Sequence, residues 1–600
     1  EESPETNAEH GQRVADGRSA TCDPWPMVSS AFPIAHVLSN GSLSTLVTDS
    51  GGGGTWRGST TVLPWAADST LDGSGHWLYL RDEETGVVWS ATPNPIGAGE
   101  SVEATCWPHK VEFHRRHRGI SCRLEITVVP ETDVEIRRVT LTNESAQSRS
   151  LRLATFSEIA LSGIGEHARH PAFDKLFLHS EILDDLPAVL YSRRPRAPTD
   201  AVPCLLYRVI DSDVAVGPVA YESDRGSFIG RGRSVRAPQA LVDPEPRPSG
   251  AHGYTLEPAL ASVVSVTLAS RQVARLALVP FVGASRREAR GAGERYATMD
   301  AIDVGFEDAE RTCRLELSLL HFDRNTLQQL QVLLSALLIP TPELGDRQAQ
   351  RISQPRLWKW GVSGDHPILL VRVHDTEETT LLAQLVRAQR FWRSRQVTID
   401  LVFLVDARSG YLDAATAKID DILRKYEQQY WRGRAGGVFV IHTEQLSSDE
   451  LLALPGAARI VLDTEHSLAE TVATRRPSAQ PLPPFTPSTQ DAPEVPTENI
   501  GRLDDLLFDN GLGGFTRDGR EYVVQLRAGE TTPAPWCNVL ANPIFGCLVS
   551  ESGLGCTWAV NANLNRLTPW SNDPVCDPPS EAIYVRDEET GVIWSPTPLP

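Results

Sequence analysis

Two segments of this chain repeat each other at a constant spacing, and this repeat limits the folds that the chain can adopt. Tyr79–Pro95 and Tyr584–Pro600 are identical at thirteen of seventeen positions, at an offset of 505 residues. Farther upstream, Pro64-Trp65 corresponds to Pro569-Trp570 at the same offset. Chance does not produce a match of this length and spacing, so the chain contains two copies of one kind of domain.

The repeated segment has the pattern of a β-hairpin. Glu83–Gly86 supplies a turn whose glycine tolerates a positive φ angle, and Val87–Trp89 forms the returning strand. We therefore expect Tyr79 and Trp89, with their counterparts in the second copy, to be mainly core and hairpin residues.

The two copies differ in the length of chain that follows them. Sequence of β type continues after Pro95 to about residue 305, whereas the second copy reaches the equivalent position at Pro600. A sandwich without most of its strands would leave open edges and exposed apolar faces. We therefore expect the 600 residues to be a fragment whose second sandwich is incomplete, which the absence of an initial methionine also favours.

Hydrophobic periodicity changes along the chain. Val134–Leu141 and Ser150–Phe156 largely alternate apolar and polar residues, as half-buried strands do, and no long helical period appears before about residue 305. This region predicts a large antiparallel β-sandwich. Asp323–Ile339 then has helical spacing of its leucines, and Pro340 ends the helix.

A different alternation follows this helix. Four apolar strand-like runs occur, and helical segments separate the first three of them; the runs are Ile368–Val373, Ile399–Val405, Val438–Ile441 and Ile460–Leu462. This alternation predicts a small parallel sheet covered by helices. Seven prolines between positions 477 and 496 predict an extended linker, and β-type sequence returns from about residue 500.

The fold prediction is therefore a multidomain, mainly β protein. Its parts are an N-terminal extension at 1–29, a first large antiparallel β-sandwich at 30–305, a helical and α/β domain with a parallel sheet at 306–475, a proline-rich linker at 476–498, and the start of a second, truncated β-sandwich at 499–600.

Charge and cysteine content exclude several classes of protein. With 57 lysines and arginines against 77 aspartates and glutamates, the formal net charge of −20 argues against binding to nucleic acid or to anionic membranes. No stretch approaches the roughly 20 apolar residues of a membrane helix, and the polar N-terminus does not resemble a signal peptide. Nine cysteines without a CxxC pair are typical of reduced thiols, so we expect a cytoplasmic location.

One loop of the second copy has the composition of a sugar-binding site. Within Asn565–Pro574, Trp570 offers an aromatic face for the C–H surface of a sugar. Arg566, Asn572 and Asp573 add planar polar groups that suit pairs of hydroxyls. These four residues are the candidate substrate-binding residues. The alternative is a rigid structural loop in which Asp573 caps backbone amides.

One cysteine–histidine pattern approaches the spacing of zinc ligands. It consists of Cys106, His109, His114 and His117. The arginines that follow His114 and His117 would repel a cation, and the intervening residues have the alternation of a strand. The sequence therefore assigns no metal ligand here.

Patterns near other strand ends and turns also favour structural roles. Asp375, Asp406 and Asp463 each follow a strand of the α/β region, at the edge where such sheets bind ligands, but we expect them to cap the helices that follow. The glycine-rich runs lack the lysine of a phosphate-binding loop, and Gly361–Asp365 departs from the nucleophile-elbow pattern at its last position. No catalytic residue is assigned.

Several segments together carry a family resemblance. They are Leu38–Gly41, Tyr79–Ser90, His170–Phe173, Lys175–Phe177, Leu357–Pro367, Asn510–Tyr522, Thr532–Asn542 and Asn565–Pro600. On these segments the chain resembles the phosphorylase-like region of cyclic β-1,2-glucan synthases and is similar to stand-alone β-1,2-oligoglucan phosphorylases. Both groups belong with the cellobiose and chitobiose phosphorylases.

The resemblance implies an order of domains in which an (α/α)6 catalytic barrel would follow Pro600. Members of the family cleave β-glucosidic bonds with inorganic phosphate as co-substrate, and they invert the anomeric carbon to give α-glucose 1-phosphate. The family's general acid lies in the barrel, so no catalytic residue is carried over, and no cofactor is implied. Arg566–Asp573 is the implied contact with a β-glucan oligosaccharide. Leu63–Asp68 of the first copy lacks the arginine, serine and asparagine, so that copy is expected to be scaffold.

Two hypotheses of different classes follow. The first is a fragment of a hexosyltransferase that acts on β-1,2-glucans, either by phosphorolysis or by control of chain length in cyclic glucan synthesis, and that is inactive without its barrel. The second is a non-catalytic carbohydrate-binding or structural scaffold. A synthase parent would make this segment the cytoplasmic part of an inner-membrane protein, without direct membrane contact of its own. The choice of parent and the existence of a homodimer stay open.

Overall fold

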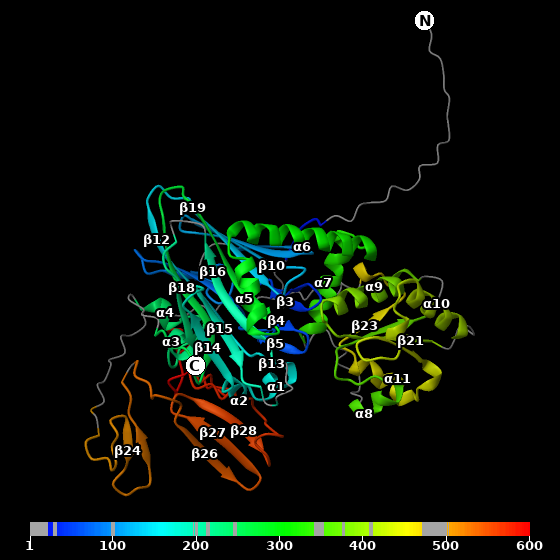
Figure 1. The fold of residues 1–600 in the computed structure, drawn as a ribbon. Coiled ribbons are helices and arrows are strands. Elements are labelled where there is room, and N and C mark those ends of the chain that lie inside the picture. Colours follow the sequence, from blue (N-terminus) through cyan, green and yellow to red (C-terminus); the bar gives the residue numbers. More distant parts are fainter. Residues whose placement is uncertain are drawn as a thin grey trace.

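A computed structural model describes residues 22–27, 33–97, 102–195, 197, 202–211, 216–243, 249–340, 353–374, 379–406, 412–470, 501, 503–527 and 529–599. The linker predicted at 476–498 and most of the extension predicted at 1–29 lie outside these residues. The described chain forms a large β-sandwich, a smaller α/β domain beside it, and a group of short strands below the sandwich (Figure 1). The prediction of a multidomain, mainly β fold with a small parallel sheet is confirmed.

Three antiparallel sheets form the sandwich. The largest has nine strands, in the spatial order β1 (Trp25–Pro26), β8 (Val102–Trp107), β9 (Lys110–His117), β10 (Ile120–Val128), β11 (Glu135–Asn143), β19 (Val273–Gly283), β16 (Cys204–Asp211), β15 (Ala188–Arg193) and β14 (Leu178–Leu183). A five-stranded sheet has the order β17 (Ala220–Asp224), β18 (Pro258–Leu268), β12 (Arg149–Glu158), β6 (Trp77–Asp82) and β7 (Val88–Ser90). The third has the order β13 (Ser162–Gly163), β5 (Thr60–Leu63), β4 (Gly53–Arg57), β3 (Leu43–Thr48) and β2 (Ala35–Ser39).

Alternating side chains explain why these sheets pack face to face. In β9, Val111 and Phe113 are fully buried, while Glu112 between them is only partly buried. Side chains from all three sheets, such as Val37, Leu78 and Leu124, belong to one apolar core. The period of two that was read from the sequence therefore corresponds to the inner and outer faces of real strands.

Short helices lie at one end of the sandwich, and longer ones along its side. The short helices are α1 (Ile164–Arg169), α2 (Pro171–Lys175), α3 (Arg225–Ile229) and α4 (Gln239–Val242). The longer ones are α5 (Arg286–Arg295), α6 (Met299–Leu320) and α7 (Arg324–Leu338). Helix α7 is fixed to the sandwich by buried polar contacts, because the indole of Trp25 donates to Gln331 at 2.7 Å and the amide of Ala35 donates to Ser335 at 2.8 Å.

The α/β domain follows α7 and has the predicted parallel sheet. Its spatial order is β22 (Val438–His442), β21 (Asp400–Val405), β20 (Ile368–Val373) and β23 (Ile460–Asp463). The accompanying helices are α8 (Gln354–Leu357), α9 (Thr380–Ser394), α10 (Leu412–Lys425) and α11 (Ser448–Ala453), with short turns η1 (Trp358–Trp360), η3 (Gln429–Trp431), η4 (Thr443–Gln445) and η5 (Leu454–Ala457). None of the helices in the described residues is long and apolar enough to span a membrane.

The last part of the described chain has seven short strands. They are β24 (Gly513–Phe515), β25 (Tyr522–Val524), β26 (Cys537–Asn542), β27 (Phe545–Ser550), β28 (Leu554–Ala559), β29 (Val585–Arg586) and β30 (Ile593–Trp594). β24 and β25 form an antiparallel pair of their own, and the other five reproduce strands of the first copy. Strands β26, β27 and β28 pair as β2, β3 and β4 do, at the offset of 502 residues. The β29–β30 hairpin keeps the register of β6–β7 at the offset of 505. The structural repeat therefore begins earlier than the sequence identity indicates.

Matching backbone constraints explain why particular residues recur in both copies. Asp72 and Asp577 have positive φ angles of 44° and 45°, and each accepts hydrogen bonds from two hydroxyls of the preceding hairpin. A Cβ atom on Gly53 would lie 1.9 Å from the carbonyl oxygen of Leu46, and one on Gly555 would lie 2.4 Å from that of Leu548. Only glycine allows so close an approach of neighbouring strands.

The two copies differ in how much of their apolar face is covered. Trp89 is 1% exposed in the first copy, whereas its counterpart Trp594 is 50% exposed. Tyr79 and Tyr584 differ in the same way. In the first copy β6 pairs with the long strand β12, while β29 pairs only with β30 among the described residues. The second copy therefore exposes several apolar side chains, among them Val539, Leu540, Tyr584, Ile593 and Trp594.

Replacement of the two equivalent tryptophans by alanine should have very different effects on stability. Trp89→Ala should lower the free energy of unfolding by about 3–5 kcal/mol, because it leaves a cavity in a closed core. Trp594→Ala should change it by less than about 1 kcal/mol, because half of the side chain is already in water. Urea unfolding followed by circular dichroism measures both. Equal losses would contradict the assignment of a covered and an uncovered copy.

Candidate functional site

The loop selected from the sequence is folded onto the edge of β28. The amide of Leu567 donates to the carbonyl of Thr557 at 2.9 Å, and Thr568 accepts from the amide of Thr557 at 2.8 Å. Both threonine hydroxyls donate to one oxygen of Glu581. These contacts hold the start of the loop in a fixed position while its outer residues stay accessible to solvent.

The structure brings Arg566 and Trp570 together and leaves Asn572 exposed beside them. The guanidinium of Arg566 donates to the carbonyl of Ala562 at 2.9 Å and to that of Trp570 at 3.4 Å. Trp570 is half-buried, and Asn572 has a φ angle of 49°, a left-handed conformation that asparagine tolerates better than most residues. An indole, a guanidinium and an amide therefore lie on one short exposed segment.

Asp573 differs from the other three candidates because both of its carboxylate oxygens are engaged. Arg225, at the start of α3 in the first copy, donates to them at 2.6 and 2.7 Å. One oxygen also accepts from the amides of Val575 and Cys576 at 2.9 and 3.0 Å. Burial by itself would raise the pKa of Asp573, but the hydrogen bonds and charge of Arg225 outweigh it and hold this pKa well below its usual range.

The same amide cap occurs at the equivalent aspartate of the first copy. Asp68 accepts from the amides of Thr70 and Leu71 at 2.8 and 3.2 Å, so an aspartate at this point terminates the loop in both copies. The bidentate pairing with Arg225 is the feature added in the second copy. Asp573 therefore caps backbone amides, as the structural interpretation predicted, and it also forms an ion pair with Arg225.

A buried network of charges extends from Asp573 into the first copy. Arg225 also lies 3.2 Å from Glu158 and 3.4 Å from Glu257, and the ammonium group of Lys175 lies 2.7 Å from Glu257. Three carboxylates thus surround two cations. Burial raises the pKa of the Glu257 carboxyl in spite of the neighbouring Lys175, which makes it the carboxyl of the network most ready to hold a proton.

Sequence reasoning did not identify this network. Arg225 and Asp573 are 348 positions apart, and neither occurs in a motif that would link them. One sequence feature pointed to the network: the segments His170–Phe173 and Lys175–Phe177 carry part of the family resemblance, and Lys175 is a member of the network. Charge pairing across two copies of a domain becomes visible only when their packing is known.

Apolar contacts reinforce the junction between the copies. Val575 is buried with Trp77, Tyr79, Phe156 and Phe228 in one cluster, and its carbonyl accepts from the amide of Gly232 at 2.8 Å. Figure 1 shows β26, β27 and β28 at the end of the sandwich that carries α3. The loop after residue 565 is therefore anchored on the first copy.

A cavity of about 470 Å³ lies in the first copy next to this network. Its lining includes Trp65, Trp77, Phe156, Glu158 and His167. Trp65 is the counterpart of Trp570, and Glu158 contacts Arg225. Aromatic walls with a few convergent polar groups are typical of small-molecule sites. Both copies thus place a tryptophan near the junction.

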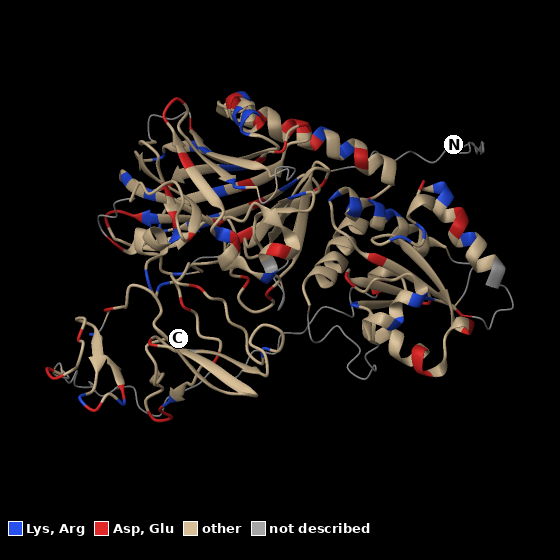
Figure 2. Ribbon diagram, turned by 60° about the horizontal axis from the view of Figure 1, so that its bottom comes forward, with Lys and Arg blue, Asp and Glu red and all other residues tan. Residues whose placement is uncertain are grey.

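The structure also tests the remaining sequence patterns, and it agrees with some of the expectations but not with all. His114 and His117 lie on opposite faces of β9, since Phe113, Arg115 and His117 form its buried face, so the cysteine–histidine pattern does not converge. Asp375 lies outside the described residues. Asp463 at the end of β23 contacts His374, and the helical turn that follows is capped by Ser467, so the cap predicted for Asp463 is wrong. Asp406 follows β21 and lies near the same histidine, and residues 407–411, on which its predicted cap depends, lie outside the described residues. Basic and acidic residues are interspersed over the chain in the view of Figure 2.

Comparisons with known proteins agree with this arrangement. The family described as "Glycosyl hydrolase 94, supersandwich domain" matches residues 25–299 and 520–600, which include both copies of the repeat. The cyclic beta-(1,2)-glucan synthase NdvB of Rhizobium meliloti (strain 1021) is 30% identical over 93% of this chain. The chain spans 20% of the length of that protein.

Two phosphorylases match shorter parts of the chain. The solabiose phosphorylase of Paenibacillus borealis is 26% identical over 29% of this chain, which covers 22% of that protein. The N,N'-diacetylchitobiose phosphorylase of Vibrio furnissii is 36% identical over 14% of this chain, which covers 10% of that protein.

Loss of the Arg225 guanidinium should destabilise the junction strongly. Arg225→Met leaves the buried Glu257 and the partly buried Glu158 and Asp573 with one cation, which should cost about 3–5 kcal/mol of unfolding free energy at pH 7. The matched control is Arg517→Met, which removes a solvent-exposed pair with Asp505 and should cost less than about 1 kcal/mol. Urea unfolding measures both, and equal effects would contradict a buried, junction-forming role.

The loss of unfolding free energy caused by Asp573→Asn should become smaller at acidic pH. Because the pKa of Asp573 is lowered in the folded chain, its carboxylate stabilises the fold above the unfolded value of 3.8, and this contribution is lost as the pH falls toward the folded value. The difference in unfolding free energy between the parent and Asp573→Asn should therefore shrink between pH 6 and pH 3. A difference independent of pH would show that the ion pair is not the origin of the effect.

Proposed function

Because the chain belongs to the glycosyl hydrolase 94 family, we propose that it is the scaffold and glucan-contacting part of a larger hexosyltransferase acting on β-1,2-glucans. The observation that carries this proposal is the alignment with the cyclic beta-(1,2)-glucan synthase over 93% of the chain. The two phosphorylase relatives support the same class of enzyme, since both are named for cleavage of sugar–sugar bonds by phosphate.

The proposed reaction of the whole enzyme is inverting phosphorolysis or the related control of chain length in cyclic glucan synthesis. In phosphorolysis, inorganic phosphate attacks the anomeric carbon from one face while a carboxylic acid protonates the leaving oxygen on the other, and α-glucose 1-phosphate results. We assign no residue of this chain to that acid. The exposed apolar side chains of the second copy support a location of the reaction centre in further protein that packs against them.

The proposed role of the 566–573 loop is to hold a β-1,2-gluco-oligosaccharide. The Trp570 ring would pack against the C–H face of a glucose unit, and Arg566 and Asn572 would hydrogen-bond its hydroxyls. Asp573 would contribute by fixing the loop, because Arg225 and two backbone amides already occupy its carboxylate. All four candidate residues thus belong to the proposed site, three as contacts with the sugar and Asp573 as the residue that fixes the loop.

A non-catalytic carbohydrate-binding or structural scaffold is the second candidate function. The aromatic-lined cavity beside Glu158 supports it, because such a cavity could hold a sugar without any reaction. For either function we propose a cytoplasmic location, or the cytoplasmic side of an inner-membrane protein, and sugar oligomers rather than nucleic acid as partners.

Removal of the Trp570 ring should weaken binding of β-1,2-gluco-oligosaccharides. We expect Trp570→Ala to raise the Kd by about tenfold, which corresponds to roughly 1.4 kcal/mol. The matched control is Trp594→Ala, an exposed tryptophan of the same copy that lies outside the loop, and its Kd should not change. Isothermal titration calorimetry with oligosaccharides of defined length measures both. An unchanged Kd for Trp570→Ala would remove the loop from the site.

An activity assay separates the two candidate functions. With phosphate and β-1,2-gluco-oligosaccharides, the 600-residue chain alone should release no α-glucose 1-phosphate, whereas the longer protein that contains it should release this product or rearrange the glucan. Release by the 600 residues alone would refute our assignment of the reaction centre to other residues. Binding without reaction by the longer protein would favour the scaffold function.

A further inference from the structure

The sheet of the α/β domain has a topological switch point that the glucan site does not use. The chain passes from β20 to β21 and β22 on one side, and then returns to β23 on the other side of β20. All of these pairings are parallel, so the carboxyl ends of β20 and β23 lie at the same edge of the sheet. In open α/β sheets, ligands bind at the carboxyl ends of strands where the order reverses in this way.

Potential metal ligands lie at this switch point. His374 follows β20 directly, and Asp463 is the last residue of β23. The register places Arg372 opposite Asp463, which brings the ends of the two strands to the same level. The amide of His374 donates to the hydroxyl of Thr464 at 3.2 Å, so the strand ends are tied together just where the side chains project.

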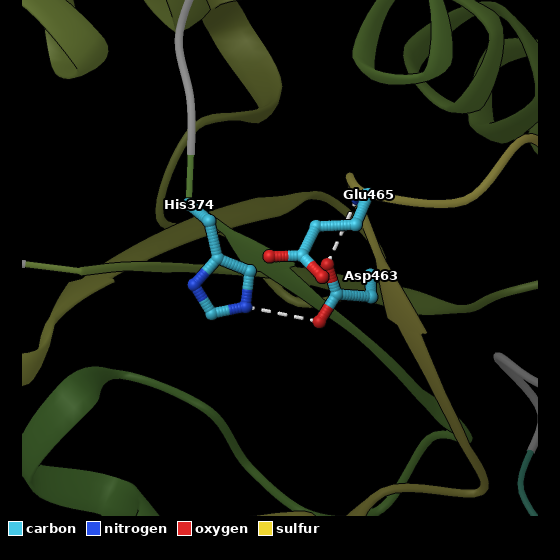
Figure 3. Close-up of side chains that lie close together, drawn as sticks. All are labelled: His374, Asp463 and Glu465. Carbon is cyan, nitrogen blue, oxygen red and sulfur yellow. Dashed lines mark hydrogen bonds and ion pairs between the residues drawn. The ribbon is translucent and has the colours of Figure 1, made fainter.

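Three side chains converge there from two strand ends. Single donor atoms of His374, Asp463 and Glu465 all lie within 4.8 Å of one another. In Figure 3 the imidazole of His374 and the two carboxylates point toward a common space. Nε2 of His374 lies 2.9 Å from Oδ2 of Asp463, and the other oxygen of Asp463 accepts from the amide of Glu465 at 2.9 Å.

A fourth side chain is placed to orient the imidazole. Oδ2 of Asp406, at the carboxyl end of β21, lies 3.7 Å from Nδ1 of His374. A carboxylate behind the non-ligating nitrogen of a histidine is the usual way in which metal sites fix the ring and its tautomer. Nδ1 of His374 therefore lies within ion-pair distance of Asp406, although beyond hydrogen-bond length, and Nε2 faces the space shared with Asp463 and Glu465.

The charge of the cluster favours a cation. Within the part of the chain that the structure describes, no lysine or arginine forms an ion pair with Asp463 or Glu465. The side chains of His374 and Asp463 are 36% and 27% exposed, so an ion from solvent can reach them. Two carboxylates facing a single imidazole form a group of ligands whose negative charge a divalent ion would compensate.

We propose that His374, Asp463 and Glu465 bind a divalent first-row metal ion at the carboxyl edge of this sheet, with Asp406 orienting His374. One imidazole and two carboxylates form a nitrogen–oxygen ligand set that suits Mn²⁺ and Zn²⁺. On binding, Nε2 of His374 exchanges its contact with Asp463 for the metal, and water completes the coordination. The site is separate from the proposed glucan loop, and it gives the α/β domain a binding role of its own.

Titration of the 600-residue chain with MnCl₂ tests the proposal, and electron paramagnetic resonance measures the free Mn²⁺ at each step. Mn²⁺ is the primary probe because the nine cysteines could bind Zn²⁺ elsewhere. One saturable Mn²⁺ site per chain is expected. Asp463→Asn should raise the Kd by at least about tenfold, and Asp406→Asn should raise it by about 10-fold through loss of orientation.

The control variant is Asp421→Asn, which changes an exposed aspartate of α10 and should leave the Kd unchanged. Circular dichroism of each variant confirms the fold. Absence of saturable Mn²⁺ binding, or equal Kd values for Asp463→Asn and Asp421→Asn, would overturn the proposal. If Asp463→Asn fails to fold, Glu465→Gln tests the same site, because Glu465 is exposed and its loss should still raise the Kd. Neither result depends on glucan binding.

Discussion

The buried guanidinium of Arg225 is the interaction on which the junction of the two repeated domains depends. It emerges at the start of a one-and-a-half-turn helix of the first copy and meets carboxylates from both copies. Without these partners, the free-energy cost of burying the Arg225 charge would exceed the stability that helix α3 contributes. Without Arg225, Asp573 would take up a proton. Each copy therefore supplies the charge that stabilises the buried charge of the other copy at this point. The apolar contacts around Val575 then close the junction.

The same sequence serves two different environments in this chain. Tyr79 and Trp89 close the core of a complete sandwich, while Tyr584 and Trp594 keep the same hairpin register and remain exposed. The hairpin must therefore be specified mainly by local terms, namely the Asp-Glu-Glu-Thr-Gly turn and its hydrogen bonds, rather than by burial. In the first copy, burial of these side chains stabilises the hairpin. In the second copy the same side chains stay exposed, so burial contributes little to the stability of the hairpin.

Much of the fold was predictable because it rests on local patterns. The strand periodicity of β11 and β12, the leucine spacing of α7 and its stop before Pro340, and the alternating runs of the α/β domain all correspond to observed elements. The same reasoning could not supply contacts between distant segments, such as Arg225 with Asp573 or Gln331 with Trp25, because pairing across 300 residues leaves no local signal. It also placed Asp463 in a helix cap, whereas its carboxylate faces His374 across the ends of two strands. Sheet order, which periodicity does not reveal, determines that neighbour.

The structure reconciles the two interpretations that the sequence left open for the loop after Asn565. A structural role and a binding role are usually treated as competitors for a residue, but in the function proposed above they fall on different residues of one segment. Asp68 and Asp573 both cap their loops, so capping is common to the aspartates of both copies. Only the loop of the second copy carries Arg566 and Asn572 on its exposed side and pairs with Arg225 of the first copy on its buried side. The buried pair fixes the loop without using its outer side chains, and a fixed loop loses less conformational entropy when a flexible sugar chain is bound. The anchoring of Asp573 is therefore compatible with the proposed sugar recognition by Trp570, rather than evidence against it.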